Sequence, residues 1–382
     1  MRITSTFIPR PSRCLASSAL AILALFSCAV SAQSAPQIVA YVFPQNSLIQ
    51  PAQIDPHSIT RINYAFANIQ DGRIVTGFAD DPANFAFLTS LRNQNPNLTV
   101  LVSVGGWLWS GGFSDVALTQ QSRARFTQSV MDFLTLYHLD GLDVDWEYPG
   151  QPGAGHPFRV EDKHNFTLLL SELRNRFEAE KQKTGRRLYL TIAAGASDEF
   201  LAHTEMADVA RSVDTVNLMT YDDYEPGDGP ITGHHAPLFA NPSDPRKASA
   251  DASVTAFEQA GVPANEILLG IPFYGHTWAS VADHANGLYQ PGKSGPAAYA
   301  PFSTIESTML NHGFIRFWDA AASVPWLYSP AQRTFVSYED PQSIAAKCKY
   351  VRTHHLGGVM FWTLEDDDPA RTLLKAIDQS LH

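Results

Sequence analysis

Short apolar runs alternate with longer amphipathic stretches along most of the chain. The runs are five to eight residues long and rich in Val, Ile and Leu. Near-continuous apolar runs of this length are typical of strands that are buried on both faces, as in a parallel sheet. We therefore expect eight strands, at Ile38–Val42, Ile59–Phe66, Leu98–Val104, Leu139–Trp146, Leu188–Ala194, Asp214–Thr220, Ile267–Pro272 and Leu356–Trp362.

Amphipathic stretches between several of these runs have the spacing of helices with one buried face. Repeated strand–helix units predict a parallel sheet covered by helices, and eight units predict closure into a TIM (β/α)8 barrel. The chain of 382 residues is long enough for one such barrel with additions. The clearest predicted helices are Gln120–Tyr137, Asp162–Lys183, Ser249–Ala260 and Pro341–Thr353.

One interval breaks this rhythm. Between about Gly275 and Tyr338 the chain is rich in Gly, Pro and aromatic residues, and Ser303–His312 is its first helical pattern of useful length. A structureless loop of this length is improbable inside a compact domain. The sequence therefore predicts a small α+β insertion over residues 275–338, between the seventh and eighth strands.

The N-terminus has the pattern of a signal peptide. Three arginines precede a small and apolar run over residues 15–30, and Ser31-Ala32 then supplies a cleavage site. The run is too short to favour a permanent transmembrane helix. We expect a signal peptide over residues 1–32, and a mature catalytic domain over residues 33–382 that is periplasmic or extracellular and free of the membrane. A second interpretation is a lipoprotein signal at Leu25–Cys28, with a lipid on Cys28.

Cysteine content and charge narrow the class of protein. Cys14 and Cys28 lie in the predicted leader, so Cys348 is alone in the mature chain and no internal disulfide can form. Charged residues make up only 17% of the chain, and the formal net charge is −11. This balance argues against a nucleic-acid partner, which requires clusters of Lys and Arg. It is compatible with a neutral polysaccharide.

The densest chemical pattern is Asp140-Gly-Leu-Asp143-Val-Asp145-Trp-Glu147. Side chains alternate along a strand, so Asp143, Asp145 and Glu147 share one face. In a barrel this face points inward, toward the C-terminal mouth where active sites lie. Three neighbouring carboxylates repel one another when all are ionised, so at least one should hold a proton. A protonated carboxylic acid there can protonate a glycosidic oxygen.

Two other interpretations of this pattern stay open on the residues alone. Clustered carboxylates can bind a hard cation, and a solvated turn can also carry them. Val144 and Trp146 favour an apolar environment, unlike the polar loop of an EF-hand. His234-His235 also suggests a metal, but no suitably spaced ligands lie nearby in the sequence. We expect neither a metal nor a cofactor.

The acidic pattern resembles the signature of family 18 glycoside hydrolases, the chitinases and their relatives, of the bacterial type with an α+β insertion. Four other segments resemble motifs of this family and occur in its order. The resemblance extends from about Ile38 to Asp368, nearly the whole mature chain. The four segments are Asn63–Phe66, Ser103–Trp107, Asn217–Asp222 and Gly358–Trp362.

The resemblance implies a retaining mechanism in which the substrate supplies the nucleophile, an exception among glycosidases. It implies that Glu147 is the general acid and then the base, and that Asp145 orients the acetamido group of the sugar. Asp143 would share a proton with Asp145, and Tyr221 would donate a hydrogen bond to the acetamido oxygen. The implied substrate-binding residues are Tyr41, Phe66, Gly106, Trp107, Met219, Asp222, Tyr274, His276 and Trp362, with Trp362 as the floor under the sugar.

One position departs from the family pattern. His276 follows Tyr274-Gly275, where many chitinases carry an arginine, so a compact ring replaces a long cationic side chain. We expect a secreted, monomeric chitinase acting on chitin or chito-oligosaccharides. The alternatives are an endo-acting hydrolase of N-glycans or of another N-acetylhexosamine glycan, and a catalytically silent chitin-binding lectin. Lectin-like relatives typically lack the residue equivalent to Glu147, which is present here.

Overall fold

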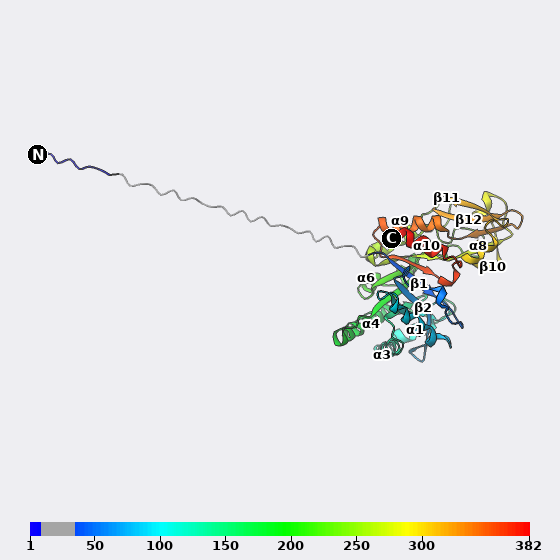
Figure 1. The fold of residues 1–382 in the computed structure, drawn as a ribbon, viewed down its shortest axis with the longest axis horizontal. Coiled ribbons are helices and arrows are strands. Elements are labelled where there is room, and N and C mark those ends of the chain that lie inside the picture. The colour runs from blue at the N-terminus through cyan, green and yellow to red at the C-terminus, as the bar shows by residue number, and fades with distance from the viewer. Residues whose placement is uncertain (9–34) are drawn as a thin grey trace. The chain divides into compact units, whose positions relative to one another are not determined.

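The eight apolar runs form a closed parallel barrel in the computed structural model, which describes residues 1–8 and 35–382 (Figure 1). Each barrel strand pairs with its neighbours in parallel, and the first strand pairs with both the second and the last, which closes the barrel. The TIM-barrel prediction is confirmed. The barrel strands are β1 Gln37–Val42, β2 Arg61–Gln70, β4 Thr99–Gly105, β5 Gly141–Asp145, β6 Tyr189–Gly195, β7 Thr215–Met219, β8 Ile267–Pro272 and β14 Gly358–Trp362.

Helices cover the outer face of the barrel, and the main hydrophobic core lies between them and the strands. Leu142 and Val144 on β5, and Trp146 directly after it, point outward and are buried in this core. The indole of Trp146 stacks on Phe113 with ring centroids 5.2 Å apart. This packing directs the alternate side chains of β5 into the barrel. The helices are α1 Asp81–Ser90, α2 Phe113–Leu118, α3 Gln120–Leu136, α4 Asp162–Thr184, α5 Asp198–Ala202, α6 Met206–Ala210, α7 Ala250–Gln259, α9 Pro341–Thr353 and α10 Thr372–Leu381.

A separate antiparallel sheet is built from the chain between β8 and β14. Its strand order is β10-β9-β13-β12-β11, and its own core includes Trp278, Tyr328 and Phe335. Figure 1 shows β10, β11, β12 and α8 together, away from α3 and α4. The elements are β9 Tyr274–Ala279, β10 Lys293–Pro301, α8 Phe302–Thr308, β11 Ile315–Asp319, β12 Val324–Ser329 and β13 Thr334–Ser337.

Two features of the fold differ from the pattern in the sequence. Strand β2 continues beyond Phe66 to Gln70, because its end pairs with the short antiparallel strand β3, Arg73–Val75. The segment 220–249 between β7 and α7 contains no helix or strand. It is held instead against the separate sheet, where the backbone of Thr232 donates to Gln290 O over 2.8 Å.

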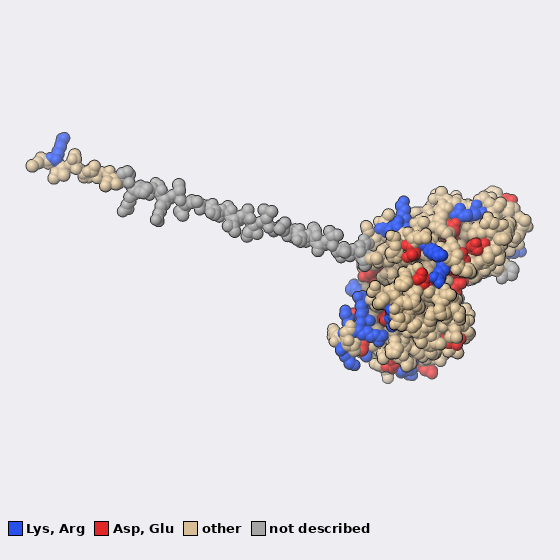
Figure 2. Space-filling model, in the orientation of Figure 1, with Lys and Arg blue, Asp and Glu red and all other residues tan. Residues whose placement is uncertain are grey.

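Residues 9–32 of the predicted leader lie outside the described residues, and so do Cys14, Cys28 and the proposed cleavage site after Ala32. Within residues 1–8 and 35–382, no helix combines the length and apolar character needed to cross a membrane. On the face shown in Figure 2, basic residues gather near α4, acidic and basic residues are interspersed elsewhere, and most of the surface carries neither.

Candidate active site

A cavity of about 980 Å³ opens where the carboxyl ends of the barrel strands meet. Tyr41, Asp145, Met219 and Trp362, from β1, β5, β7 and β14, all line it. This is the end of a TIM barrel at which catalytic residues lie. The other predicted residues that line it are Phe66, Trp107, Glu147, Tyr221, Asp222, Tyr274 and His276.

Asp143 lies fully buried beneath this cavity and accepts four hydrogen bonds. The hydroxyls of Tyr41 and Ser103 donate to its Oδ2 over 2.9 and 2.7 Å. Thr191 Oγ1 and Asn217 Nδ2 donate to its Oδ1 over 2.5 and 3.0 Å. Burial raises the pKa of Asp143, and the three hydroxyl donors oppose that rise. Four donors on two oxygens favour the ionised carboxylate.

Asp145 lies one inward position further along β5 and has a different environment. Its side chain is 3% exposed, and its Oδ1 has no hydrogen-bond partner among the described residues. Burial raises the pKa of Asp145 well above its usual range, and the charges of Glu147 and Asp143 raise it further. Before a substrate binds, the surroundings of Asp145 therefore favour its protonated form.

Glu147 follows the end of β5 and reaches the wall of the cavity. The hydroxyl of Ser110 fixes the backbone at Glu147. It accepts a hydrogen bond from the Glu147 amide over 2.9 Å and donates one to Asp145 O over 3.0 Å. Burial raises the pKa of Glu147 to about 7; Tyr148 opposes the rise and the charge of Asp222 adds to it. A carboxyl group with this pKa can give and retake a proton near neutral pH.

Aromatic rings form one wall of the cavity. Trp362 stacks on Phe66 with centroids 5.4 Å apart and planes 22° apart, and its centroid lies 5.8 Å from that of Tyr41. Gly106 supports this wall from behind. Its φ is +75°, and a Cβ there would lie 2.6 Å from Phe66 Cζ. Gly106 therefore lets the Phe66 ring approach, while Gly105 lines the cavity.

Tyr221 and Met219 come from the end of β7 and the residues just after it, and both side chains line the cavity. The Tyr221 hydroxyl lies 4.0 Å from Met360 Sδ, which is a weak acceptor. Burial raises the pKa of Tyr221 well above its usual range, and the negative charges of Asp222 and Asp145 raise it further. The hydroxyl therefore stays protonated and can donate to a ligand.

Asp222 has the opposite electrostatic environment to Asp145. Its Oδ1 accepts from His276 Nε2 over 2.8 Å and from Tyr274 Oη over 2.7 Å, and it lies 3.6 Å from His235 Nδ1. Burial alone would raise the pKa of Asp222, but His235 and His276 outweigh burial and hold it well below its usual range. Asp222 is therefore an ionised carboxylate in a ring of donors.

The structure brings the predicted residues together, with two outside the cavity lining: Asp143 beneath it and Gly106 behind Phe66. Other lining residues were not predicted. Phe43 directly follows the end of β1, and an aromatic residue at the carboxyl end of a barrel strand could have indicated a cavity-lining position. Tyr299 belongs to β10 and stacks on Tyr274 at 4.4 Å, which no sequence pattern indicated. The unpredicted lining residues also include Phe78, Tyr148, Asp223 and Glu225.

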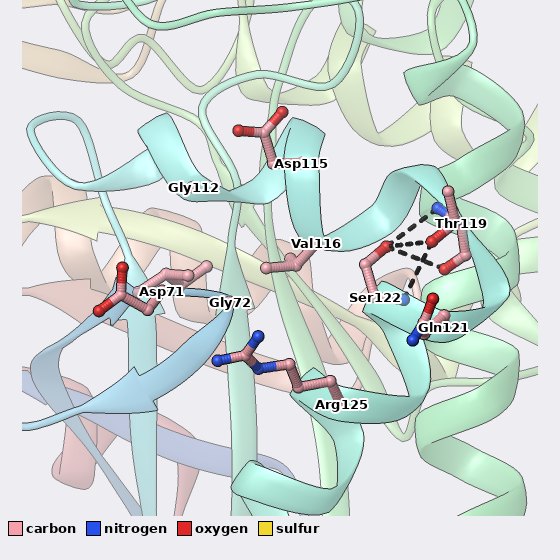
Figure 3. A pocket seen from close by; sticks show the side chains of 10 residues that line it. Asp71, Gly72, Gly112, Asp115, Val116, Thr119, Gln121, Ser122 and Arg125 are labelled. Atoms are coloured by element: carbon pink, nitrogen blue, oxygen red, sulfur yellow. Dashed lines mark hydrogen bonds between the residues drawn. The ribbon is translucent and has the colours of Figure 1, made fainter.

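A second hollow, of about 630 Å³, lies beside the turn between β2 and β3 and the start of α3 (Figure 3). Several of its polar groups have local partners. The hydroxyls of Thr119 and Ser122 hydrogen-bond to each other at the start of α3. Asp115 pairs with Arg159 at 2.7 Å. It contains no buried carboxylate, and we assign it no chemistry.

Comparison with known proteins shows the family of the chain. The sequence profile of glycosyl hydrolases family 18 matches residues 37–367. Chitinase A1 of Niallia circulans is 38% identical over 83% of this chain. The chain spans about half (54%) of the length of that relative.

Two solved structures extend the comparison. A family 18 N-acetylglucosaminidase from Paenibacillus barengoltzii is 39% identical, with a TM-score of 0.83, covering 90% of this chain and 99% of its own. Human YKL-39, described as a pseudo-chitinase with retained chitooligosaccharide binding, is 26% identical, with a TM-score of 0.82, covering 91% of this chain and 100% of its own. The likeness therefore extends to both active and silent proteins.

Proposed function

The chain belongs to glycosyl hydrolases family 18, and from this premise we propose that it is a chitinase that hydrolyses β-1,4-linked N-acetylglucosamine polymers. The observation that carries the proposal is the row of Asp143, Asp145 and Glu147, which leads from the barrel interior to the cavity wall. The three carboxyl groups lie in different environments, so each can have a different role in catalysis.

In the first step, protonated Glu147 transfers its proton to the glycosidic oxygen, and the bond from that oxygen to the anomeric carbon breaks. The carbonyl oxygen of the sugar's own acetamido group forms the new bond to this carbon, which gives a cyclic oxazolinium ion. The nucleophile belongs to the substrate, so no side chain forms a covalent bond. Trp362 supports the sugar from below, because apolar sugar faces stack on indole rings.

Asp145 and Tyr221 act on the acetamido group in this proposal. Asp145 accepts from the acetamido N–H and stabilises the positive charge that develops on it, while the proton of Asp145 is shared with Asp143. Tyr221 donates its hydroxyl to the acetamido oxygen and orients it toward the anomeric carbon. Such preorganised groups lower the barrier because they need no rearrangement as charge develops.

In the second step, ionised Glu147 takes a proton from a water molecule, and the hydroxide oxygen attacks the anomeric carbon of the oxazolinium ion. The ring opens, the acetamido group is restored, and Glu147 is protonated again. Two inversions at one carbon retain the β configuration. The pKa of Glu147, about 7, suits a group that is acid and base in turn.

A second candidate uses the same chemistry with a different product. The likeness to an N-acetylglucosaminidase over 99% of that protein favours release of single sugars from a chain end. A silent lectin is disfavoured because Glu147 is present. An endo-acting hydrolase of N-glycans is a third candidate.

Product analysis on defined substrates tests these candidates. We would incubate the protein with N-acetylglucosamine oligomers of four to six units, colloidal chitin and an N-glycosylated protein. A chitinase releases mainly dimers and trimers, whereas an N-acetylglucosaminidase releases monomers throughout. Cleavage of the glycoprotein alone would contradict the proposal, and so would binding of oligomers without any cleavage.

We also propose that the protein is secreted. The arginines and the apolar run that precede Ser31-Ala32 support this, and the mature chain would begin at Gln33. Mass spectrometry of the protein exported by a bacterial host tests the cleavage site. Retention of residues 1–32, or a lipid on Cys28, would contradict it.

A further inference from the structure

Three potential metal ligands meet at the wall of the cavity, in a cluster of Asp222, His235 and His276. One ligand atom from each residue lies within 4.8 Å of the others. Asp222 Oδ1 is 2.8 Å from His276 Nε2 and 3.6 Å from His235 Nδ1. Donor atoms around a tetrahedral Zn²⁺ are about 3.3 Å apart, given Zn–N and Zn–O distances near 2.0–2.1 Å. The cluster is therefore close to the size of such a site.

His235 is the observation that points to a ligand. Its side chain is fully buried, and neither ring nitrogen has a hydrogen-bond partner among the described residues. Buried polar groups are nearly always paired, since an unpaired one costs free energy. Nδ1 of His235 is directed at the Asp222 carboxylate, beyond hydrogen-bond reach. A metal ion bound to both atoms would satisfy this nitrogen.

His276 can present the nitrogen that a metal requires. Its Nε2 now donates to Asp222, and its Nδ1 lies 3.4 Å from Ala298 O. If the ring proton moves from Nε2 to Nδ1, Nδ1 can donate to this carbonyl and Nε2 presents a lone pair to the metal. Metal-binding histidines commonly donate their other ring N–H to a carbonyl in this way. No net proton is gained or lost.

The charges around the cluster also favour a cation. Asp223 and Glu225 both line the cavity beside Asp222. The ammonium group of Lys347, whose charge also reaches Asp223, is already paired with Glu339. Acidic residues thus outnumber free basic groups at this wall.

We propose that Asp222, His235 and His276 bind a Zn²⁺ ion that inhibits the enzyme. Two imidazoles and one carboxylate suit Zn²⁺ or Cu²⁺, whereas Mg²⁺ and Ca²⁺ prefer all-oxygen ligands. Asp222 and His276 line the cavity, so a bound ion and its water would occupy space needed by the sugar. The ion is an inhibitor and has no part in the hydrolysis. Its binding does not rest on the proposed function.

Calorimetric titration of the full-length, EDTA-stripped protein tests this site directly. We expect one saturable Zn²⁺ per chain and no saturable Mg²⁺ binding over the same range. His235→Asn and His276→Asn should each weaken Zn²⁺ binding by at least about 10- to 100-fold. Loss of a residue that only hydrogen-bonds to a metal ligand already lowers metal affinity by this factor. His234→Asn is the matched control, because this adjacent buried histidine pairs with Asp319, outside the cluster. It should bind Zn²⁺ like the wild type.

Absence of Zn²⁺ binding by the wild type would overturn the proposal. Unchanged affinity in both cluster variants would also overturn it. If His235→Asn fails to fold, as thermal melting would show, His276→Asn alone decides. In kinetic assays Zn²⁺ should raise the apparent KM for an oligosaccharide without lowering kcat. A fall in kcat at constant KM would place the ion outside the cavity and contradict the proposal.

Discussion

Two acidic regions face the same cavity and respond to burial in opposite ways. On β5, burial raises the pKa of Asp145 and Glu147, and repulsion between these acids adds to the rise for Asp145. At the end of β7, burial acts in the same direction on Asp222, but two histidines outweigh it and lower its pKa. Burial thus accompanies a proton donor, Glu147, in one region and a fixed negative charge, Asp222, in the other.

This difference shows that burial alone does not decide the role of a carboxyl group. Asp145 Oδ1 has no hydrogen-bond partner among the described residues, whereas Asp222 Oδ1 accepts from Tyr274 and His276. Donors stabilise the charged form, and apolar surroundings with like charges stabilise the protonated form. Changing one carboxyl group at a time tests this contrast.

Glu147→Gln should have the largest effect. Glutamine has nearly the same shape but cannot give up a proton as an acid, so kcat should fall by about 10²- to 10⁴-fold. Oligosaccharide binding, measured by fluorescence, should survive. Glu199→Gln is the control, because this exposed carboxyl group also lines the cavity and should matter little. Turnover of Glu147→Gln within about tenfold of the wild type would contradict the assignment.

Asp145→Asn should have the next largest effect. The amide cannot carry the negative charge that stabilises the cationic acetamido group, so kcat should fall by about 10²- to 10³-fold. The measurement is turnover of fully acetylated oligomers beside de-N-acetylated ones. The wild type should cleave only the acetylated series. Equal cleavage of both series would show that the acetamido group is not the nucleophile.

Asp222→Asn should change the pH profile. The general acid must be protonated, so activity is present below the pKa of Glu147 and is lost as pH rises through about 7. The charge of Asp222 contributes to this raised pKa, and its removal should move the alkaline limb of the kcat/KM profile to lower pH. An alkaline limb that stays in place or moves to higher pH would show that the charge of Asp222 does not raise the pKa of Glu147.

Treatment with EDTA should not lower the rate at which a soluble oligomer is hydrolysed. The mechanism proposed for β5 needs no metal, and the ion proposed at Asp222 is an inhibitor. The rate is measured before and after dialysis against EDTA, with Mg²⁺ added back as a control. Strong loss of activity would instead favour a metal held by the carboxylates of β5.

Much of the barrel and of the acidic row could be predicted from local patterns. A period of two places Asp143, Asp145 and Glu147 on one face, because outward Val144 and Trp146 must be buried. The four hydrogen bonds to Asp143 could not be predicted. Thr191 and Tyr41 reach it from β6 and β1, so they meet only when the barrel closes.

The environment of Asp222 was the least predictable part of the site. His235 lies in the irregular segment 220–249, which has no periodic pattern to place it. Its backbone amide donates to Ser337 Oγ over 2.9 Å, a contact with β13 of the separate sheet. His276 was singled out from the sequence as a departure from the family pattern. That it shares one carboxylate with His235 depends on long-range packing.

The anomeric form of the first product tests the central claim most directly. Proton nuclear magnetic resonance, recorded within minutes of adding enzyme to an N-acetylglucosamine oligomer, distinguishes the new reducing ends before they equilibrate. Proton donation by Glu147 with acetamido assistance predicts that the β anomer appears first. Initial release of the α anomer would contradict this account, because it would require direct attack of water at the anomeric carbon.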